Sequence, residues 1–510
     1  MLALVILAGS CANRVVPQGG PVDEDPPVLI SSTPENMAVN FNEDKVVFRF
    51  DEYVRLENQD QIFISPPLSE SPRYRANGKE VIVELPDELS DDITYTISFG
   101  NSIVDNNEGN AYQDFKYVFS TGKTLDSLIL EGIVFRAEDL EPEKDAIVVL
   151  YPDTIPDSSV FRIMPTYYSR LDEQGAFTVF NIREGSYRLF AIEDVNKNFL
   201  AEIPSERIAF HDTLLLIPAA DPVTMYSFKQ QPAEVKVLNS KSTALGVSVV
   251  IFNGPAPDPE AELLYNELLY SDLSSYGDSL WLYHSIESDS TGIILNMENM
   301  IDTVWTFRKN TSENAVGELQ ITGYSRNGND SVFIQFNMPF KKTVSGGVYL
   351  DSAEVEYVLN EKGEGVAGSF TIQRPDSSRS LFISKGTFVD IYDNSCDSMR
   401  TQIMIPDERQ TGIVELEVSP PDHDAVYVVF TDASWNRFDK IRVSQPGTFE
   451  ITGLMPGGYI VSAFLDEDDD GDWTPGDFYS SRQPEKVIVN RDQISVRANW
   501  TIQIKWEIDN

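Results

Sequence analysis

An acidic stretch near the C-terminus carries the residues with the clearest chemistry. Its carboxylates recur at alternating positions with one glycine among them, and the residues are Asp466, Asp468, Asp470, Gly471, Asp472 and Asp477. Counted from Asp466 as position 1, they occupy positions 1, 3, 5, 6, 7 and 12. A calcium loop needs oxygen ligands at this spacing, a glycine at the sixth position for its sharp turn and a carboxylate at the twelfth. We therefore expect this loop to bind Ca²⁺, which would also relieve the repulsion among its carboxylates.

A second interpretation of the loop stays open. Asp477 stands where a bidentate glutamate is usual, and the flanking sequence does not predict the helices that enclose a helix–loop–helix calcium site. The alternative is a solvated acidic loop held together by Asx turns. Bound calcium would in any case stiffen a corner between two strands rather than catalyse a reaction.

A related loop lies 272 residues upstream. Asp194, Asn196 and Asn198 supply oxygen at the first, third and fifth positions, but Lys197 lies between them and Phe199 occupies the glycine position. We expect an Asx-turn scaffold here, with a degenerate calcium loop as the alternative.

The two loops belong to an internal repeat. One copy holds Gly175-Ala-Phe177, Ile182, Gly185, Tyr187 and Ala191, and the other holds Gly447-Thr-Phe449, Leu454, Gly457, Tyr459 and Ala463, each pair 272 residues apart. Upstream, residues 130–134 look like 410–414, and residues 146–151 look like 425–430. The repeat predicts two sister domains at about 126–228 and 409–510.

Alternation of apolar and polar residues dominates the chain and predicts short strands. Examples are residues 46–50, 80–84, 94–99, 117–119, 147–151, 332–336 and 426–430, with turn-forming clusters such as Asn77-Gly78 between them. The sequence suggests one helix of any length, at about 259–273, where Glu, Leu and Ala are frequent. This pattern predicts an all-β fold of tandem β-sandwich domains with little helix.

The N-terminus and the two cysteines suggest export. Residues 1–11 form a short apolar run followed by small residues and Cys11, which resembles a bacterial lipobox in which that cysteine is lipidated. An ordinary signal peptide or a buried strand is the alternative. Residues 12–25, rich in Pro and Gly, would form a flexible tether. Cys396 has acidic neighbours and no flanking cation, so we do not expect it to be a nucleophile.

Charge and histidine content narrow the function. The chain of 510 residues has 81 Asp and Glu against 39 Lys and Arg, a formal net charge of −42, which disfavours nucleic acid and docking on anionic lipid. Its three histidines, His211, His284 and His423, lie far apart in sequence, and no phosphate loop, zinc spacing or nucleophile elbow is found. We predict no catalytic residues.

Two stretches resemble known families. The repeated Gly-x-Phe, Leu/Ile, Gly-x-Tyr pattern is similar to the transthyretin-like or carboxypeptidase-regulatory-like β-sandwich module. The N-terminal part, about 26–123, resembles the bacterial Ig-like domain of S-layer proteins, through residues 25–27, 32–34, 47–54, 64–67, 94–100 and 119–122. Cysteine, tether, Ig-like domain and transthyretin-like domain in this order resemble Ig-like-domain lipoproteins of Bacteroidetes. That resemblance implies an envelope location and no established chemistry.

The middle of the chain completes the expected domain order. Residues 316–408 are similar to a second Ig-like domain, since 336–340 and 386–393 echo parts of the first, and residues 229–315 would form a β domain of another type.

We expect a non-enzymatic lipoprotein of the outer membrane, on its periplasmic or cell-surface face. It would be a spacer and scaffold that contacts other envelope proteins, for example as an accessory subunit of an assembly or secretion complex. The alternative is a surface protein that binds glycans or mediates adhesion, with Trp281, Trp305, Trp435 and Trp473 as aromatic platforms. An enzyme would instead require a cleft with perturbed carboxylates.

Overall fold

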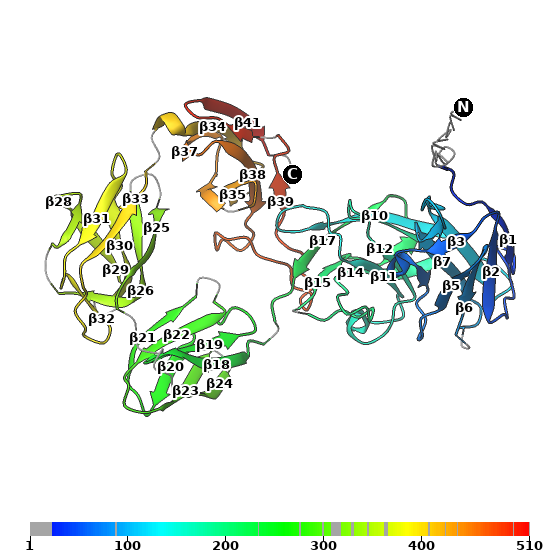
Figure 1. The fold of residues 1–510 in the computed structure, drawn as a ribbon, viewed down its shortest axis with the longest axis horizontal. Coiled ribbons are helices and arrows are strands. Elements are labelled where there is room, and N and C mark those ends of the chain that lie inside the picture. Colours follow the sequence, from blue (N-terminus) through cyan, green and yellow to red (C-terminus); the bar gives the residue numbers. More distant parts are fainter. Residues whose placement is uncertain are drawn as a thin grey trace, which may run out of the picture. The chain divides into compact units, whose positions relative to one another are not determined.

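The computed structural model describes residues 23–508, apart from 87–88, 204, 233, 275–276, 298–299, 308–317, 328–330, 344–345, 362–365, 406–407, 424, 436 and 493. Strands and three short 3₁₀ segments make up its regular structure, so the all-β prediction is confirmed (Figure 1). In the part of the chain described, no helix is long and apolar enough to cross a membrane. Cys11 and the predicted signal and tether up to residue 22 lie outside the described residues.

The N-terminal region is a sandwich of antiparallel sheets. One sheet has the order β1-β2-β6-β5, a second has the order β4-β7-β9, and β3 pairs with β8. The strands are β1 (Leu29–Thr33), β2 (Lys45–Phe50), β3 (Val54–Leu56), β4 (Phe63–Ser65), β5 (Arg73–Asn77), β6 (Glu80–Glu84), β7 (Thr94–Gly100), β8 (Ile103–Asp105) and β9 (Phe115–Ser120), with η1 at Gln59–Gln61.

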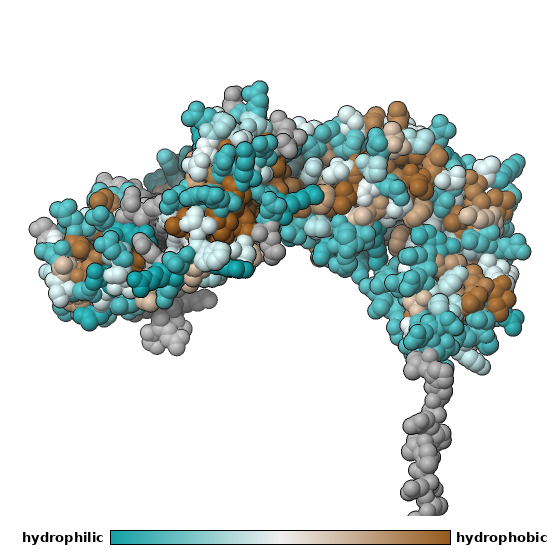
Figure 2. All heavy atoms as spheres, turned by 90° about the horizontal axis from the view of Figure 1, so that it is seen from above, coloured by the Kyte–Doolittle hydropathy of each residue, from teal (hydrophilic) through white to brown (hydrophobic). Residues whose placement is uncertain are grey.

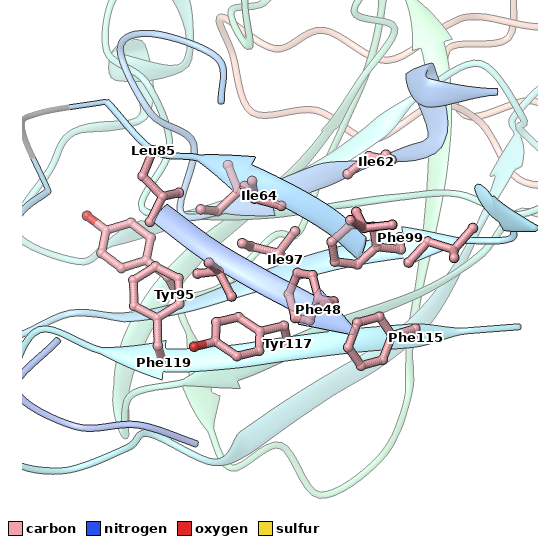
Figure 3. Packing of buried hydrophobic residues seen from close by; sticks show 14 of the residues in the cluster. Phe48, Ile62, Ile64, Leu85, Tyr95, Ile97, Phe99, Phe115, Tyr117 and Phe119 are labelled. Atoms are coloured by element: carbon pink, nitrogen blue, oxygen red, sulfur yellow. The ribbon is translucent and has the colours of Figure 1, made fainter. Parts of the chain in front are cut away.

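Aromatic rings fill the core of this sandwich. Phe48 is fully buried, and its ring meets those of Phe99, Phe115 and Tyr117 edge-on at 5.1–5.4 Å between centroids (Figure 3). Edge-to-face packing of this kind is a favourable geometry for aromatic pairs. The inward rings come from alternate residues of β2, β7 and β9, which is why the period of two in the sequence predicted these strands correctly.

The next region holds the first sister domain. Its strands are β10 (Leu128–Arg136), β11 (Ile147–Pro152), β12 (Tyr167–Arg170), β13 (Ala176–Ile182), β14 (Gly185–Ile192), β15 (Arg207–Phe210), β16 (Leu215–Ile217) and β17 (Val223–Lys229), with η2 at Asp157–Phe161. β11 pairs with β12 and β14, β14 also pairs with β16, and β10 pairs with β13.

The region after it corrects the helix prediction. Residues 259–273 form two strands, β20 (Glu260–Leu264) and β21 (Leu268–Leu273). Along β20, Ala261 and Leu263 are partly buried while the glutamates on either side are exposed, which is strand periodicity despite the helix-favouring composition. Tyr265 has φ 73° and breaks the segment between the two strands. Neighbouring strands are β18 (Val237–Ala244), β19 (Val247–Phe252), β22 (Ser279–His284), β23 (Ser290–Met297) and β24 (Met300–Phe307).

Two sheets follow in the region of 319–405. Their orders are β25-β26-β30-β29, with β32 paired to β26, and β28-β27-β31-β33. The strands are β25 (Ile321–Asn327), β26 (Ser331–Lys342), β27 (Val348–Leu350), β28 (Ala353–Glu354), β29 (Tyr357–Glu361), β30 (Val366–Gln373), β31 (Arg379–Ile383), β32 (Phe388–Asp390) and β33 (Met399–Ile403).

The C-terminal region is the second sister domain. One sheet has the order β37-β34-β41 and the other β36-β35-β38-β39, with β40 paired to β38. The strands are β34 (Gly412–Ser419), β35 (Val426–Asp432), β36 (Arg437–Arg442), β37 (Gly447–Leu454), β38 (Gly457–Leu465), β39 (Val487–Val489), β40 (Ile494–Val496) and β41 (Thr501–Glu507), after η3 at Glu408–Gln410.

Strand register shows how the sister domains correspond. Leu130 pairs with Val179 in the first domain, and Val414 pairs with Ile451 in the second. Since Val179 and Ile451 are 272 residues apart, Leu130 corresponds to Val414. The expected match of 130–134 with 410–414 is therefore wrong by four residues. Short Gly-Ile-Val segments misled the alignment, because they repeat in sequence without marking the same place in the sheet.

The described chain divides into two compact units. One consists of residues up to 134 together with 142–201 and 209–225, and the other holds the remaining residues to the C-terminus. The five-domain map from the sequence stays a prediction. Hydrophilic residues cover much of the face seen in Figure 2, with hydrophobic patches among them, as a chain with net charge −42 suggests.

Candidate metal centre

The acidic loop begins where β38 ends, and its first aspartate is buried. Asp466 is 3% exposed, whereas Asp468 and Asp470 are exposed. One carboxylate oxygen from each of these three residues lies within 4.8 Å of the others. The structure thus brings together the residues predicted at positions 1, 3 and 5 of the loop, an arrangement that a hard cation with oxygen ligands could bridge.

Backbone amides fix the loop around Asp466. Its Oδ1 accepts from the Asp469 amide at 2.7 Å and its Oδ2 from the Gly471 amide at 3.0 Å. Gly471 has φ +83°, which glycine adopts without strain. The predicted glycine at position 6 therefore makes the turn that keeps Asp466 pointing into the loop.

The other two predicted ligands make different contacts. Asp472 Oδ1 lies 2.7 Å from Lys440 Nζ. Asp477 accepts hydrogen bonds from Gln230 Nε2 at 2.9 Å and from Ser480 Oγ at 2.6 Å. Burial raises the pKa of Asp477, but these bonds more than offset it and hold the pKa below its ordinary value. Neither residue joins the group of three carboxylates among the described residues, so the calcium assignment stays a prediction that rests on Asp466, Asp468 and Asp470.

The sequence did not point to Glu485, which supports the loop from outside its twelve positions. It is 3% exposed, and its carboxylate accepts from the Glu467 amide at 2.7 Å and the Thr474 amide at 2.9 Å. Burial raises the pKa of Glu485, and the nearby charges of Asp468 and Asp466 raise it further. Its role depends on strand β39 returning beside β38, which loop spacing alone does not reveal.

The sister loop uses the same backbone scaffold. The Phe199 amide donates to Asp194 Oδ2 at 3.1 Å, as the Gly471 amide donates to Asp466 Oδ2 at 3.0 Å. The amide of Asn198 donates to both Asp194 Oδ1 at 2.9 Å and Asn196 Oδ1 at 3.1 Å. These contacts are those of an Asx-turn scaffold, and metal binding by this loop stays untested.

Calcium is expected to stabilise the domain that carries the acidic loop. At about 100 times the dissociation constant, an ion that binds only the folded state adds about 2.7 kcal/mol, or several degrees in melting temperature. The double variant Asp468→Ala, Asp470→Ala should lose this calcium-dependent shift. Differential scanning calorimetry with added calcium or with a chelator measures it.

The matched control is Asn196→Ala, Asn198→Ala in the sister loop, which should keep the shift. Comparing the shift, rather than the melting temperature itself, separates metal binding from the loss of loop hydrogen bonds. Equal melting of the parent with calcium and with chelator would refute the assignment.

Histidine and cysteine chemistry finds little support in the described residues. His284 Nε2 lies 3.1 Å from Ser248 Oγ, but Ser248 is fully buried and its hydroxyl also contacts Thr306 at 2.8 Å. Burial lowers the pKa of His284. Cys396 is 3% exposed and its sulfur accepts from the Phe388 amide at 3.4 Å. Both groups serve packing, because no substrate can reach them as they lie.

The four tryptophans proposed as platforms lie in two regions. Trp281 and Trp305 are 37% and 40% exposed on β22 and β24. Trp435 and Trp473 line one cavity of the second sister domain.

Comparisons with known proteins support the fold. The family model of a bacterial Ig-like domain matches residues 23–121. A search of curated proteins finds no match. Solved structures with similarity include the major pilin subunit BcpA of Bacillus cereus, at 12% identity over 75% of this chain and 99% of that chain, with TM-score 0.14. The surface layer protein SbsC, domains 1–6, is 11% identical over 92% of this chain and 67% of that chain, with TM-score 0.16.

A third similar structure is the insect immune protein hemolin, at 10% identity over 74% of this chain and 99% of that chain, with TM-score 0.19. The family match covers the N-terminal sandwich whose aromatic core is described above. The chain is therefore a tandem β-sandwich protein with a bacterial Ig-like domain at residues 23–121.

Proposed function

We propose that this protein is a non-enzymatic, lipid-anchored spacer and protein-interaction scaffold of the bacterial outer membrane, and an accessory subunit of an assembly or secretion complex. Cys11 would carry the lipid and residues 12–25 would form the tether. The resemblance to Bacteroidetes lipoproteins motivates the location, and the tandem sandwiches with an Ig-like domain support the scaffold role.

The observation that carries the scaffold role is the packing of the Ig-like domain on the first sister domain. Tyr168 of β12 is 4% exposed, and its ring lies 5.3 Å from that of Phe63 in β4. The Tyr168 amide donates to Ser65 Oγ at 3.1 Å. A buried contact of this kind joins two sandwiches into one body instead of leaving them on a flexible linker.

Polar contacts reinforce the same interface. Asn181 Nδ2 donates to Thr96 Oγ1 at 2.6 Å. Arg183 donates to the Asp92 carbonyl at 2.6 Å and contacts the Asp126 carboxylate at 3.3 Å. Both domains belong to one compact unit. Such a unit suits a protein that holds partners at a fixed distance from the tether.

The test is purification of the full chain from its native membrane in mild detergent, followed by mass spectrometry. A scaffold predicts a reproducible set of envelope proteins in fixed proportion to the chain. The matched control is a chain with Tyr53→Ala, a change at a residue that is 63% exposed and outside the interface. Recovery of the chain alone, at all detergent strengths that keep it folded, would refute the scaffold role.

A further inference from the structure

The second sister domain contains a cavity of about 310 Å³ on the outer face of the sheet that holds β35 and β38. Its lining residues are Glu138, Asp139, Val429, Thr431, Trp435, Lys440, Ser462, Ala463, Phe464, Asp472, Trp473 and Val487. This volume is at the lower end of the range of about 300–1,000 Å³ that is usual for small-molecule sites.

The register identifies the equivalent residues in the first sister domain. Val149 pairs with both Phe190 and Tyr168, and Val429 pairs with both Ser462 and Lys440. Ser462 therefore stands in place of Phe190, and Lys440 in place of Tyr168. By the same register, Thr431, two residues beyond Val429, stands in place of Tyr151.

In the first domain these positions are filled. Tyr151 is fully buried, its ring meets that of Phe190 at 6.0 Å, and its hydroxyl donates to the Ile163 carbonyl at 2.7 Å. Ile163 lies in the connection between β11 and β12, which also contains η2 with the fully buried Val160. The second domain joins β35 to β36 through residues 433–436 alone, so it lacks that connection. The cavity exists because smaller and polar side chains replace three aromatic rings and a loop is missing.

A buried hydroxyl in this cavity lacks a partner. Thr431 is 4% exposed, and its Oγ1 has no hydrogen-bond partner in the structure. A buried hydroxyl without a hydrogen bond costs about 1–3 kcal/mol. Ser462, 7% exposed, also lines the cavity. The floor therefore offers hydroxyl groups to a ligand, while the two indoles and Phe464 offer apolar surface.

The charged groups at the cavity are already paired. Asp472 contacts Lys440 at 2.7 Å, Asp139 contacts Arg136 at 2.7 Å, and Glu138 contacts Arg207 at 2.7 Å. A charged ligand would have to break one of these pairs or enter without a counterion. A purely apolar ligand would leave Thr431 unpaired. The lining suits a neutral ring that has both apolar and hydroxyl-bearing edges.

We propose that this cavity binds one ring of a neutral sugar, as a unit of a glycan. The C–H face of the ring would stack on Trp435 or Trp473, as apolar groups do on indole faces, and ring hydroxyls would bond Thr431 and Ser462. This inference goes beyond the scaffold role and depends neither on it nor on the lipid anchor.

The test is binding of the methyl glycosides of glucose, galactose, mannose and N-acetylglucosamine to the full chain, by saturation-transfer NMR and tryptophan fluorescence. At least one glycoside should bind with a millimolar dissociation constant. Thr431→Val, which keeps the shape and removes the hydroxyl, should weaken binding about tenfold without lowering the melting temperature. The double variant Thr431→Tyr, Ser462→Phe restores two rings of the sister domain and should abolish binding.

The matched control is Trp500→Ala in the same domain, because Trp500 is 61% exposed and does not line the cavity. It should bind as the parent does. The proposal is overturned if no glycoside binds, if the filled double variant binds as well as the parent, or if the cationic probe tetramethylammonium binds the cavity in place of every glycoside.

Discussion

Replacing Asp105 with alanine is expected to lower the free energy of unfolding of the Ig-like domain by about 2–4 kcal/mol. Asp105 ends β8 and is 1% exposed. Its Oδ1 accepts from the amides of Asn107, Glu108 and Gly109 at 2.7–3.1 Å, and its Oδ2 accepts from the Asn110 amide at 2.7 Å. One side chain therefore holds the whole turn between β8 and the segment that leads to β9.

The same carboxylate makes the domain sensitive to acid. Burial raises the pKa of Asp105, but the four amide donors more than offset it and hold the pKa at about 2, below the ordinary 3.8. A pKa lowered by folding contributes stability above pH 3.8, and this is lost as the pH falls towards 2. The contribution is about 2 kcal/mol.

Urea unfolding of the parent and of Asp105→Ala between pH 2 and pH 7 measures both effects. The parent should lose stability over the acid range, and the variant should lose less because the titrating group is gone. Glu108→Ala, an exposed change in the same turn, is the control. A parent and variant with the same pH dependence would contradict the role given to Asp105.

Tyr168→Ala is expected to uncouple the Ig-like domain from the first sister domain. The ring of Tyr168 lies 5.3 Å from Phe63 on one domain and 4.8 Å from Phe199 on its own. Removing a buried aromatic ring costs about 3–5 kcal/mol. The parent should show one calorimetric transition for the two domains, and the variant two transitions at lower temperatures.

Two further variants separate coupling from general damage. Phe63→Ala removes the partner ring from the other side and should also split the transition. Tyr53→Ala, at an exposed tyrosine of the Ig-like domain, should leave it single. Two transitions already present in the parent would contradict a rigid two-domain unit.

The sequence predicted best where local chemistry and tertiary structure agree. Alternating residues such as those of β2 and β7 indicated buried strands, because a sheet with one face in a core needs that period. The helix prediction at 259–273 failed since it rested on composition, and cross-strand pairing of β20 with β23 outweighs a weak preference for helix.

The loops and the cavity show where prediction from sequence ends. Spacing identified Asp466, Asp468 and Asp470, whose positions the turn itself determines. Asp477 lies further along, and its contact with Gln230 spans 247 residues, which no local rule contains. The cavity at Thr431 required the register of β35 in both sister domains, and the alignment upstream of the 272-residue repeat was not secure without it.

The central claim is a scaffold held at the membrane by lipid on Cys11, and fractionation of cells tests it most directly. Cells that express the parent chain or Cys11→Ser are lysed, and the chain is quantified in the membrane pellet after a carbonate wash. We predict that the parent stays in the pellet and that Cys11→Ser moves to the soluble fraction. Equal partitioning of the two chains would contradict the lipid anchor.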